Sequence, residues 1–166
     1  GGRRVAAVAV TSQRQGLAFL DADGDEIYLG PNVDLRAVFE GAELDEAHRD
    51  EIYETTGHTP AFMLAAGKLR WFQVHREEAY GRIAAVLSLG DWLSFKLCGV
   101  LATERTLAAE AGLLDLRTGS WADDLYGELG LPLNHAGLAP TVVAADEVVG
   151  RVSALASEQT GLAPGT

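Results

Sequence analysis

Residues 102–115 read ATERTLAAEAGLLD and place one carboxylate, Glu104, between two threonines at a point where a helix can begin. Small residues follow Glu104, and the apolar run at residues 113–116 has the pattern of a short strand. The simplest interpretation is structural, because Thr103 can cap a helix and an acid in the first turn suits the helix dipole. A functional interpretation of Glu104 therefore depends on the segments around it.

The segments before this stretch predict strands. Residues 4–11 are apolar without polar alternation, which is typical of a central strand covered on both faces. Two short apolar runs, residues 17–20 and 26–29, flank an Asp-Gly turn and predict a hairpin. Residues 82–88 fit either a strand or a buried turn.

Helical patterns separate and follow these strands. The first runs from Asp34 to a stop at Gly57, and the second covers residues 61–74. A third is expected to begin with Asp91 as its cap and to end at Gly99. The remaining expected elements are a helix at residues 121–129, a short strand at residues 148–152 and a helix ending at residues 160–162. The alternation of strands and helices indicates an α/β chain.

Composition excludes several classes of protein. With 166 residues, 48% of them apolar, the chain can bury the core of one domain. The net charge is -11, with acids concentrated at residues 21–26 and 40–54, so nucleic acid is not an expected partner. Cys98 is the single cysteine and excludes an intrachain disulfide, which suits a cytoplasmic protein. No apolar run approaches the roughly 18 residues of a membrane span.

Motifs for several common cofactors are missing from the sequence. It contains no G-x-x-x-x-G-K-[ST], G-x-G-x-x-G, C-x-x-C or H-E-x-x-H pattern. The four histidines are scattered singly, at positions 48, 58, 75 and 135. The sequence therefore predicts no metal site formed by this chain.

Six segments follow one another along the chain: AVAVTSQRQG (7–16), DADGDEIYLGPNVDLRA (21–37), TTGHTPAFMLAAGKLRW (55–71), AAVLSLGDWLSFKLCG (84–99), ATERTLAAEAGLLDLRTGSW (102–121) and TGLAPGT (160–166). Together and in this order, they resemble the N-terminal domain of the FGGY carbohydrate kinases. The resemblance covers essentially the whole chain as a single domain, residues 1–166. It implies part of a ribonuclease H-like (actin/hexokinase ATPase) α/β lobe, with a mixed sheet flanked by helices.

The resemblance also implies a chemistry and a set of site residues. Family members transfer a phosphoryl group from ATP, with Mg²⁺, to a sugar or polyol hydroxyl held between two lobes. Carried over to this chain, Glu104 is the candidate catalytic base, Arg14 and Gln15 face the sugar from the first loop, and Asn32 and Asp34 lie on the next wall. Asn32 stands where the family usually has tryptophan. Alternatives remain open, since Arg14 can form a surface ion pair and Asp34 can cap a helix.

The expected function is that of the sugar-binding lobe of an ATP-dependent carbohydrate kinase. A xylulokinase-like substrate comes first, with autoinducer-2 kinase or another FGGY activity as the alternative. A non-catalytic sugar-binding module is the alternative from a different class. The resemblance further implies that a phosphate-binding strand upstream and a C-terminal lobe lie outside this chain. Most of the ATP site would lie there too, and an open sheet edge beside residues 4–11 would favour a homodimer.

Overall fold

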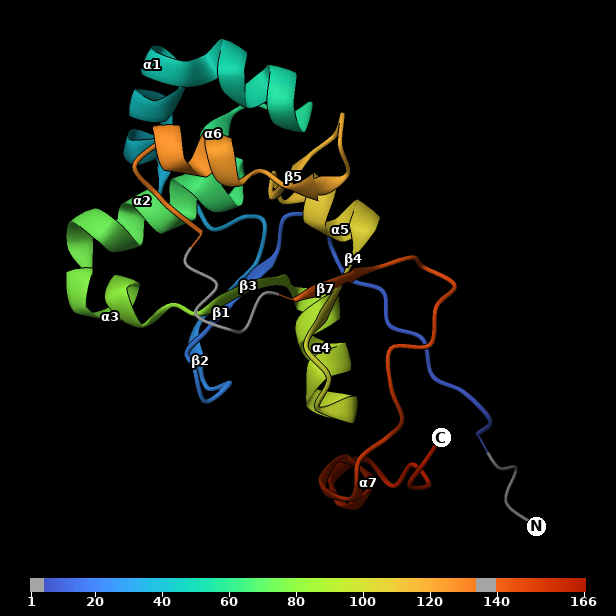
Figure 1. Cartoon of the computed structure of the whole chain (residues 1–166). Coiled ribbons are helices and arrows are strands. Elements are labelled where there is room, and N and C mark those ends of the chain that lie inside the picture. The colour runs from blue at the N-terminus through green and yellow to red at the C-terminus, as the bar shows by residue number, and fades with distance from the viewer. Residues whose placement is uncertain (1–4, 134–139) are drawn as a thin grey trace.

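The computed structural model describes residues 5–133 and 140–166 and confirms the mixed α/β fold (Figure 1). Its largest sheet has the strand order β2-β1-β3, and both pairings are antiparallel. The parallel pair β4–β7 and the antiparallel pair β5–β6 form two smaller sheets. The strands are β1 (Leu17–Leu20), β2 (Glu26–Gly30), β3 (Ala85–Ser88), β4 (Ala102–Glu104), β5 (Leu114–Asp115), β6 (Ser120–Trp121) and β7 (Thr141–Val143).

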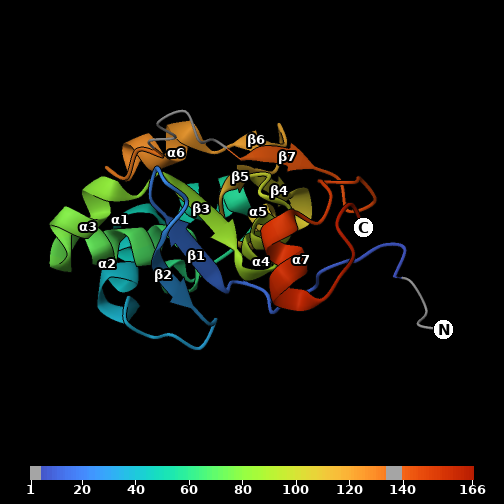
Figure 2. The ribbon, with the colours of Figure 1, turned by 90° about the horizontal axis from the view of Figure 1, so that it is seen from below.

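Helices lie on both faces of the three-stranded sheet, with α1, α2 and α3 on one side and α4 on the other (Figure 2). The helices are α1 (Val38–Thr56), the 3-10 turn η1 (Ala61–Met63), α2 (Ala65–His75), α3 (Glu77–Arg82), α4 (Leu89–Cys98), α5 (Arg105–Glu110), α6 (Asp123–Glu128) and α7 (Ala154–Thr160). Within the described ranges, no helix combines the length and apolar character needed to cross a membrane.

Strand β1 is the central strand of the three-stranded sheet, and its side chains contribute to two hydrophobic cores. Leu17 and Phe19 belong to the larger core, which α1 and α2 cover, whereas Ala18 and Leu20 belong to a smaller core against α4. This division follows from the strand geometry, since successive side chains point to opposite faces. All four residues of β1 are buried. The strand that is covered on both faces, which the sequence predicted at residues 4–11, is therefore β1.

The prediction of a strand at residues 4–11 is wrong for the part that the structure describes. Residues 5–13 adopt no regular secondary structure, and residues 5–9 are exposed. A strand exists only when its backbone pairs with a neighbour, and no described strand pairs with this segment. It runs instead beside the irregular segment at residues 144–152, with which it lines one cavity (Figures 1 and 2).

The predicted hairpin at residues 17–30 is confirmed, and its turn explains why the sequence revealed it. The Asp21 Oδ1 atom accepts hydrogen bonds from the backbone N–H of Asp23 at 3.1 Å and of Asp25 at 3.0 Å. Gly24 has a φ of +83°, a conformation that glycine adopts without steric cost. All of these contacts lie within residues 21–25, so the sequence of the turn is enough to predict it.

Several helix boundaries differ from the predictions. Residues 34–37 form turns, and α1 begins only at Val38. The predicted helix at residues 61–74 is divided into η1 and α2 because Leu64 has an extended backbone. Gly57 and Gly99 end α1 and α4 as expected, each with a positive φ.

Two predicted caps and one predicted strand are also wrong. Helix α4 is capped by Ser88, whose hydroxyl accepts the Asp91 N–H, so Asp91 lies inside the first turn. Helix α5 is capped by Glu104, whereas Thr103 belongs to β4. Residues 148–152 form no strand. The strand in this part of the chain is β7, which lies earlier in the sequence and pairs with β4.

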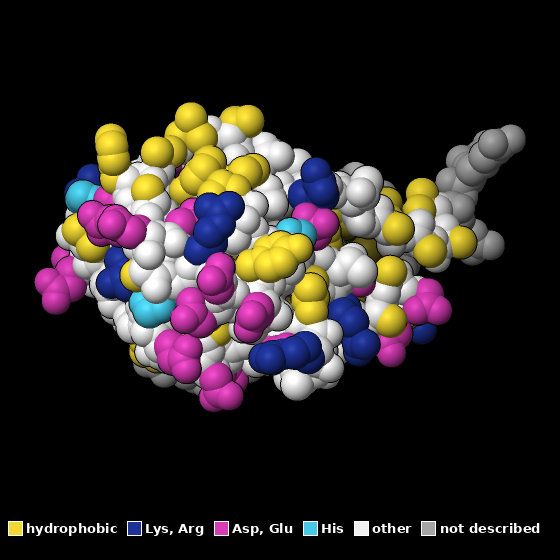
Figure 3. Space-filling model, turned by 90° about the horizontal axis from the view of Figure 1, so that it is seen from above, with side chains coloured by type: hydrophobic (Ala, Val, Ile, Leu, Met, Phe, Trp, Pro, Cys, Tyr) yellow, Lys and Arg dark blue, Asp and Glu magenta, His cyan; other side chains and the backbone are white. Residues whose placement is uncertain are grey.

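Acidic side chains gather on the face seen in Figure 3, beneath which α1 lies. The exposed acids of α1 are Glu43, Glu46, Asp50, Glu51 and Glu54. Like charges this close repel any polyanion that approaches. The surface over α1 is therefore unsuited to binding a polyanion.

Candidate substrate site

The first loop, residues 12–16, is held against the start of α4. The Leu89 N–H donates to the Gly16 carbonyl at 3.0 Å. A Cβ at Gly16 would lie 2.8 Å from the Leu89 Cδ1 atom, so a larger residue would require the Leu89 side chain to shift. Gln15 has a φ of +58°, which non-glycine residues rarely adopt. The loop is thus fixed in one strained conformation, a feature that often marks functional sites.

Arg14 extends from this loop toward the last residue of α5. Its Nη1 atom lies 3.7 Å from the Glu110 Oε1 atom. The Arg14 side chain is 74% exposed and that of Glu110 is 27% exposed. Exposed pairs of this kind contribute roughly 0–1 kcal/mol to stability. The ion pair foreseen as the alternative for Arg14 is therefore present but weak, and Arg14 remains available to a ligand.

Asn32 is joined to the first loop through its backbone. The Asn32 N–H donates to the Gln13 Oε1 atom at 3.2 Å, across 19 residues of sequence. Gln13 was not among the predicted site residues, although an amide next to Arg14 was the available signal. This bond joins the first loop to the second wall, by which we mean the segment that carries Asn32 and Asp34.

The carboxylate of Asp34 forms hydrogen bonds with other residues of the protein. Its Oδ2 atom accepts the Tyr28 hydroxyl at 2.8 Å and the Arg36 Nε–H at 2.7 Å, and its Oδ1 atom accepts the Arg36 N–H at 3.0 Å. Burial opposes ionisation, but these bonds outweigh it and hold the pKa of Asp34 below its usual 3.8. The predicted helix cap is wrong, since α1 has Ala37 at its cap position and Asp34 closes only the preceding turn. Its role in sugar binding stays a prediction.

Lys68 holds the backbone of Asp34 in place, although it was not among the predicted site residues. The side chain is buried, and its Nζ atom donates to the carbonyls of Asp34 and Phe62, both at 2.7 Å. Burial lowers the pKa of this ammonium group. A lysine on the inner face of an apolar helix was the available signal, but its partner Asp34 lies 34 residues away.

Glu104 uses one carboxylate oxygen as a helix cap. The Oε2 atom accepts hydrogen bonds from the N–H groups of Thr106 at 3.0 Å and Leu107 at 3.1 Å, and from the Thr106 hydroxyl. Burial opposes ionisation, but these bonds outweigh it and lower the pKa of Glu104 below 4.5. The structure thus gives Glu104 a structural role, while the catalytic role stays a prediction.

Asp91 holds the junction of β4 and α5 in place, and sequence reasoning saw it only as a cap. Its Oδ1 atom accepts the Glu104 N–H at 3.0 Å, and its Oδ2 atom accepts the hydroxyls of Thr103 at 2.8 Å and Ser88 at 2.9 Å. The side chain is buried, and burial raises the pKa of Asp91 above 3.8. This carboxylate therefore ties α4 to the backbone that carries Glu104.

The predicted residues fall into two groups. A cavity of about 550 Å³ is lined by Ser12, Asp91 and Glu104 but by none of Arg14, Gln15, Asn32 and Asp34. Through Gln13, the first loop instead contacts Asn32, and through Arg14 it reaches Glu110. The structure therefore joins the first loop to the second wall and does not bring Arg14 into contact with Glu104.

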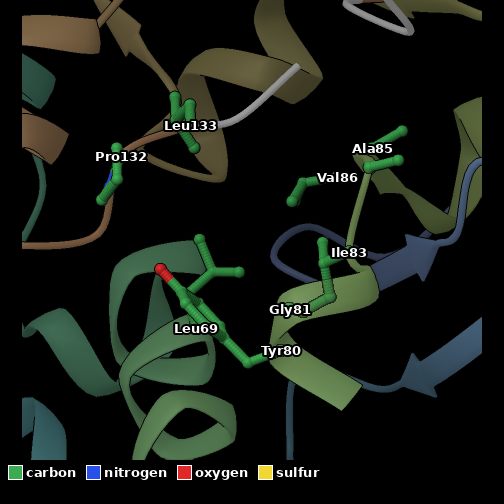
Figure 4. Close-up of a pocket in the computed structure, with 9 residues that line it drawn as sticks. Leu69, Tyr80, Gly81, Ile83, Ala85, Val86, Pro132 and Leu133 are labelled. Atoms are coloured by element: carbon green, nitrogen blue, oxygen red, sulfur yellow. The ribbon is translucent and has the colours of Figure 1, made fainter. Parts of the chain in front are cut away.

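A second cavity is unsuited to a sugar. It measures about 130 Å³ and lies between α2, α3, β3 and residues 132–133 (Figure 4). Its lining is mainly apolar, with side chains such as Leu69, Ile83, Val86 and Leu133. A polyhydroxylated ligand needs a hydrogen-bond partner for each buried hydroxyl, so this cavity is not assigned to the sugar.

The described part of the chain contains no cluster of side chains that could hold a metal ion by themselves. Magnesium is held by carboxylate oxygens, phosphates and water. Residues 5–133 and 140–166 contain no group of three or more histidine, cysteine, aspartate or glutamate residues placed to hold a metal ion.

Comparison with known proteins identifies related sequences over the whole chain. The N-terminal domain of the FGGY family of carbohydrate kinases matches residues 2–166. An autoinducer-2 kinase of Salmonella paratyphi B is 36% identical over 166 residues, which cover 98% of this chain and 31% of the relative. An autoinducer-2 kinase of Klebsiella pneumoniae is also 36% identical, with 98% of this chain and 30% of the relative covered. The chain thus spans about a third of these relatives.

Solved structures share the fold. A gluconate kinase from Lactobacillus acidophilus superposes with a TM-score of 0.87 at 22% identity, over 99% of this chain and 33% of that one. A xylulose kinase from Rhodospirillum rubrum superposes with a TM-score of 0.79 at 30% identity, over 90% of this chain and 31% of that one. The described lobe therefore has the architecture of the corresponding third of these kinases.

Proposed function

We propose that this chain, which belongs to the FGGY family of carbohydrate kinases and matches its N-terminal domain, forms the sugar-binding wall of an ATP-dependent kinase. One observation carries the proposal. The first loop is strained at Gln15, exposes Arg14 and is joined to Asn32 through Gln13. These groups can donate to and accept from sugar hydroxyls.

The proposed work of this lobe is to bind and orient the acceptor sugar. ATP with Mg²⁺ would supply the phosphoryl group, and holding the hydroxyl in line with it lowers the barrier by removing orientational freedom. Arg14 and Gln15 would contact the sugar directly. Asp34 and Lys68 would hold the neighbouring wall, because their bonds fix the backbone on which Asn32 lies.

Glu104 is the candidate base within this proposal. Its position in the wall of the 550 Å³ cavity supports the role, because a ligand there could reach the carboxylate. The cap bonds and the lowered pKa weigh against it, because a carboxylate with a depressed pKa accepts a proton less readily. The proposed function therefore rests on the first loop, and the role of Glu104 is tested separately.

The remaining partners and the setting are proposed on the same basis. Because the chain spans 31% of a curated relative, we propose that the active enzyme includes a further lobe that carries most of the ATP site. A cytoplasmic location and pairing as a homodimer remain proposals. The curated relatives at 36% identity make the autoinducer-2 precursor the first substrate to test, and the xylulose kinase at 30% identity makes a ketose the second.

The test is sugar-dependent ADP release by the full-length protein. The screen covers ketoses, polyols, aldonates and the autoinducer-2 precursor, with a contaminating-kinase control from a mock purification. We expect ADP release with at least one of these sugars and a phosphorylated sugar as the product. Sugar binding without ADP release would instead favour a non-catalytic sugar-binding module.

A further inference from the structure

The α3 cavity is the space between α2, α3, β3 and residues 132–133 (Figure 4), and it is larger than an ordinary packing gap. Its volume is about 130 Å³, whereas protein interiors contain few voids larger than a water molecule. An engineered apolar cavity of about 150 Å³ stays dry and binds benzene. The α3 cavity therefore has room for one six-membered ring.

The walls of the α3 cavity are apolar. Leu69 of α2 and Val86 of β3 belong to the larger hydrophobic core, and Ile83 and Leu133 pack against it. Figure 4 shows these four side chains around one open space. Of the described residues that line the cavity, none has a charged side chain. A charged ligand would lose its hydration there without gaining a partner, which excludes nucleotides and sugar phosphates.

Tyr80 carries the one polar side-chain group among the described residues that line the cavity. Its side chain is partly buried, and its hydroxyl forms no hydrogen bond with the described part of the chain. Figure 4 shows this hydroxyl directed toward the side of the cavity where Pro132 lies. Burial raises the pKa of Tyr80 above its usual 10.0. The phenol therefore stays protonated at neutral pH and is free to donate one hydrogen bond to a ligand.

The α3 cavity has a clear entrance and a wall that is held in place. Gly81 and Pro132 line it and are exposed, and a Cβ at Gly81 would lie in open space. The segment before Pro132 is tied to α2, because the Gln73 Nε2 atom donates to the Gly130 carbonyl at 2.9 Å. Small-molecule sites are usually preformed in this way.

We propose that the α3 cavity is a second ligand site, which takes a small, uncharged, single-ring aromatic molecule with one hydroxyl group. The ring fills the apolar space between Leu69, Val86 and Leu133, and the ligand's hydroxyl accepts a hydrogen bond from Tyr80. None of the residues predicted to bind the sugar lines this cavity. The site therefore adds a ligand class unrelated to the sugar and does not depend on the proposed function.

The experiment measures the binding of phenol and of toluene to the full-length protein, because these probes share a ring and differ in the hydroxyl group. Saturation-transfer NMR gives the affinity, and a thermal melt gives the stabilisation that a ligand of the folded state produces. Tyr80→Phe removes the hydroxyl group of the site, and Ile83→Trp and Leu133→Trp fill the cavity from different walls. Val74→Trp is the matched control, because Val74 is 59% exposed on α2 and does not line the cavity.

We expect saturable binding of phenol with a Kd of about 1 mM or below, which is within reach of so small a ligand. Tyr80→Phe should weaken the binding of phenol relative to that of toluene by about three- to tenfold, as the loss of one hydrogen bond predicts. Ile83→Trp and Leu133→Trp should each weaken both probes by about tenfold or more, since the added ring occupies the space of the ligand. Val74→Trp should leave both affinities unchanged.

Three results would overturn the inference. One is the absence of saturable binding of both probes up to about 10 mM. Another is unchanged binding by folded Ile83→Trp and Leu133→Trp proteins, which would place the probes elsewhere. The third is a phenol-to-toluene affinity ratio that Tyr80→Phe changes by less than about twofold. Tyr80→Phe keeps the ring in place, so it tests the proposal even where a tryptophan variant fails to fold.

Discussion

Replacing Glu104 separates its two assigned roles, because the variants affect stability and catalysis differently. The Oε2 atom caps α5 through the N–H groups of Thr106 and Leu107. Glu104→Ala removes this acceptor, and the loss of a helix cap typically costs about 1 kcal/mol, within a range of roughly 0.5–2. Glu104→Gln keeps an oxygen at the same place, so its free energy of unfolding should fall by less than about 0.5 kcal/mol.

The pKa of Glu104 adds a pH dependence to this prediction. Because the folded-state pKa lies below 4.5, ionised Glu104 stabilises the fold above pH 4.5, and this contribution is lost as the pH falls through the folded-state value. Glu104→Gln removes this contribution. Urea unfolding followed by tryptophan fluorescence, repeated between pH 3 and 7, measures both effects. An alanine variant as stable as the unaltered protein would refute the cap argument.

Catalysis is measured with the same two variants in the full-length enzyme. If Glu104 is the base, Glu104→Gln should lower kcat by about 10²- to 10⁴-fold while both substrates still bind, because an amide cannot accept the proton. If Glu104 serves only as a cap, Glu104→Gln should leave kcat within about threefold. A large fall in kcat without a loss of stability would therefore assign the catalytic role, and an unchanged kcat would exclude it.

The remaining predictions concern residues that hold the site in place. Lys68→Met should lower the free energy of unfolding by about 2–3 kcal/mol, since two carbonyls lose their donor, and urea unfolding that shows less than about 0.5 kcal/mol would contradict this. Asp91→Asn should become more stable relative to the unaltered protein as the pH rises above 3.8. Burial raises the folded-state pKa of Asp91, so as the pH rises the unfolded chain releases the Asp91 proton before the folded protein does; a constant difference between pH 3 and 7 would exclude this.

Local chemistry explains what the sequence revealed. The hairpin turn is specified by Asp21 and Gly24, and the helix stops by Gly57 and Gly99, since each acts within a few residues of its own position. The family resemblance was confirmed because its segments lie in order along the whole chain. The apolar pattern of residues 4–11 predicted a buried strand. The prediction failed because a strand also needs a neighbouring strand to pair with, and no described strand pairs with this segment.

The supporting contacts could not be predicted because they join distant segments. Lys68 reaches Asp34 across 34 residues, and Asp91 reaches the backbone of Glu104 across 13. The contact of Glu110 with Arg14 likewise depends on how α5 packs beside the first loop. The sequence therefore predicted the loops that are proposed to bind the sugar, whereas the residues that hold these loops in place emerged only from the fold.

The most direct test of the central claim is the effect of Arg14→Ala on the two Michaelis constants of the full-length enzyme. Arg49→Ala, an exposed arginine on α1, is the matched control. If the first loop binds the sugar, Arg14→Ala should raise the KM for the sugar by about tenfold or more, as the loss of a hydrogen bond from a charged group predicts, and leave the KM for ATP nearly unchanged. A sugar KM equal to that of Arg49→Ala would show that Arg14 forms only a surface ion pair, and it would contradict the proposed site.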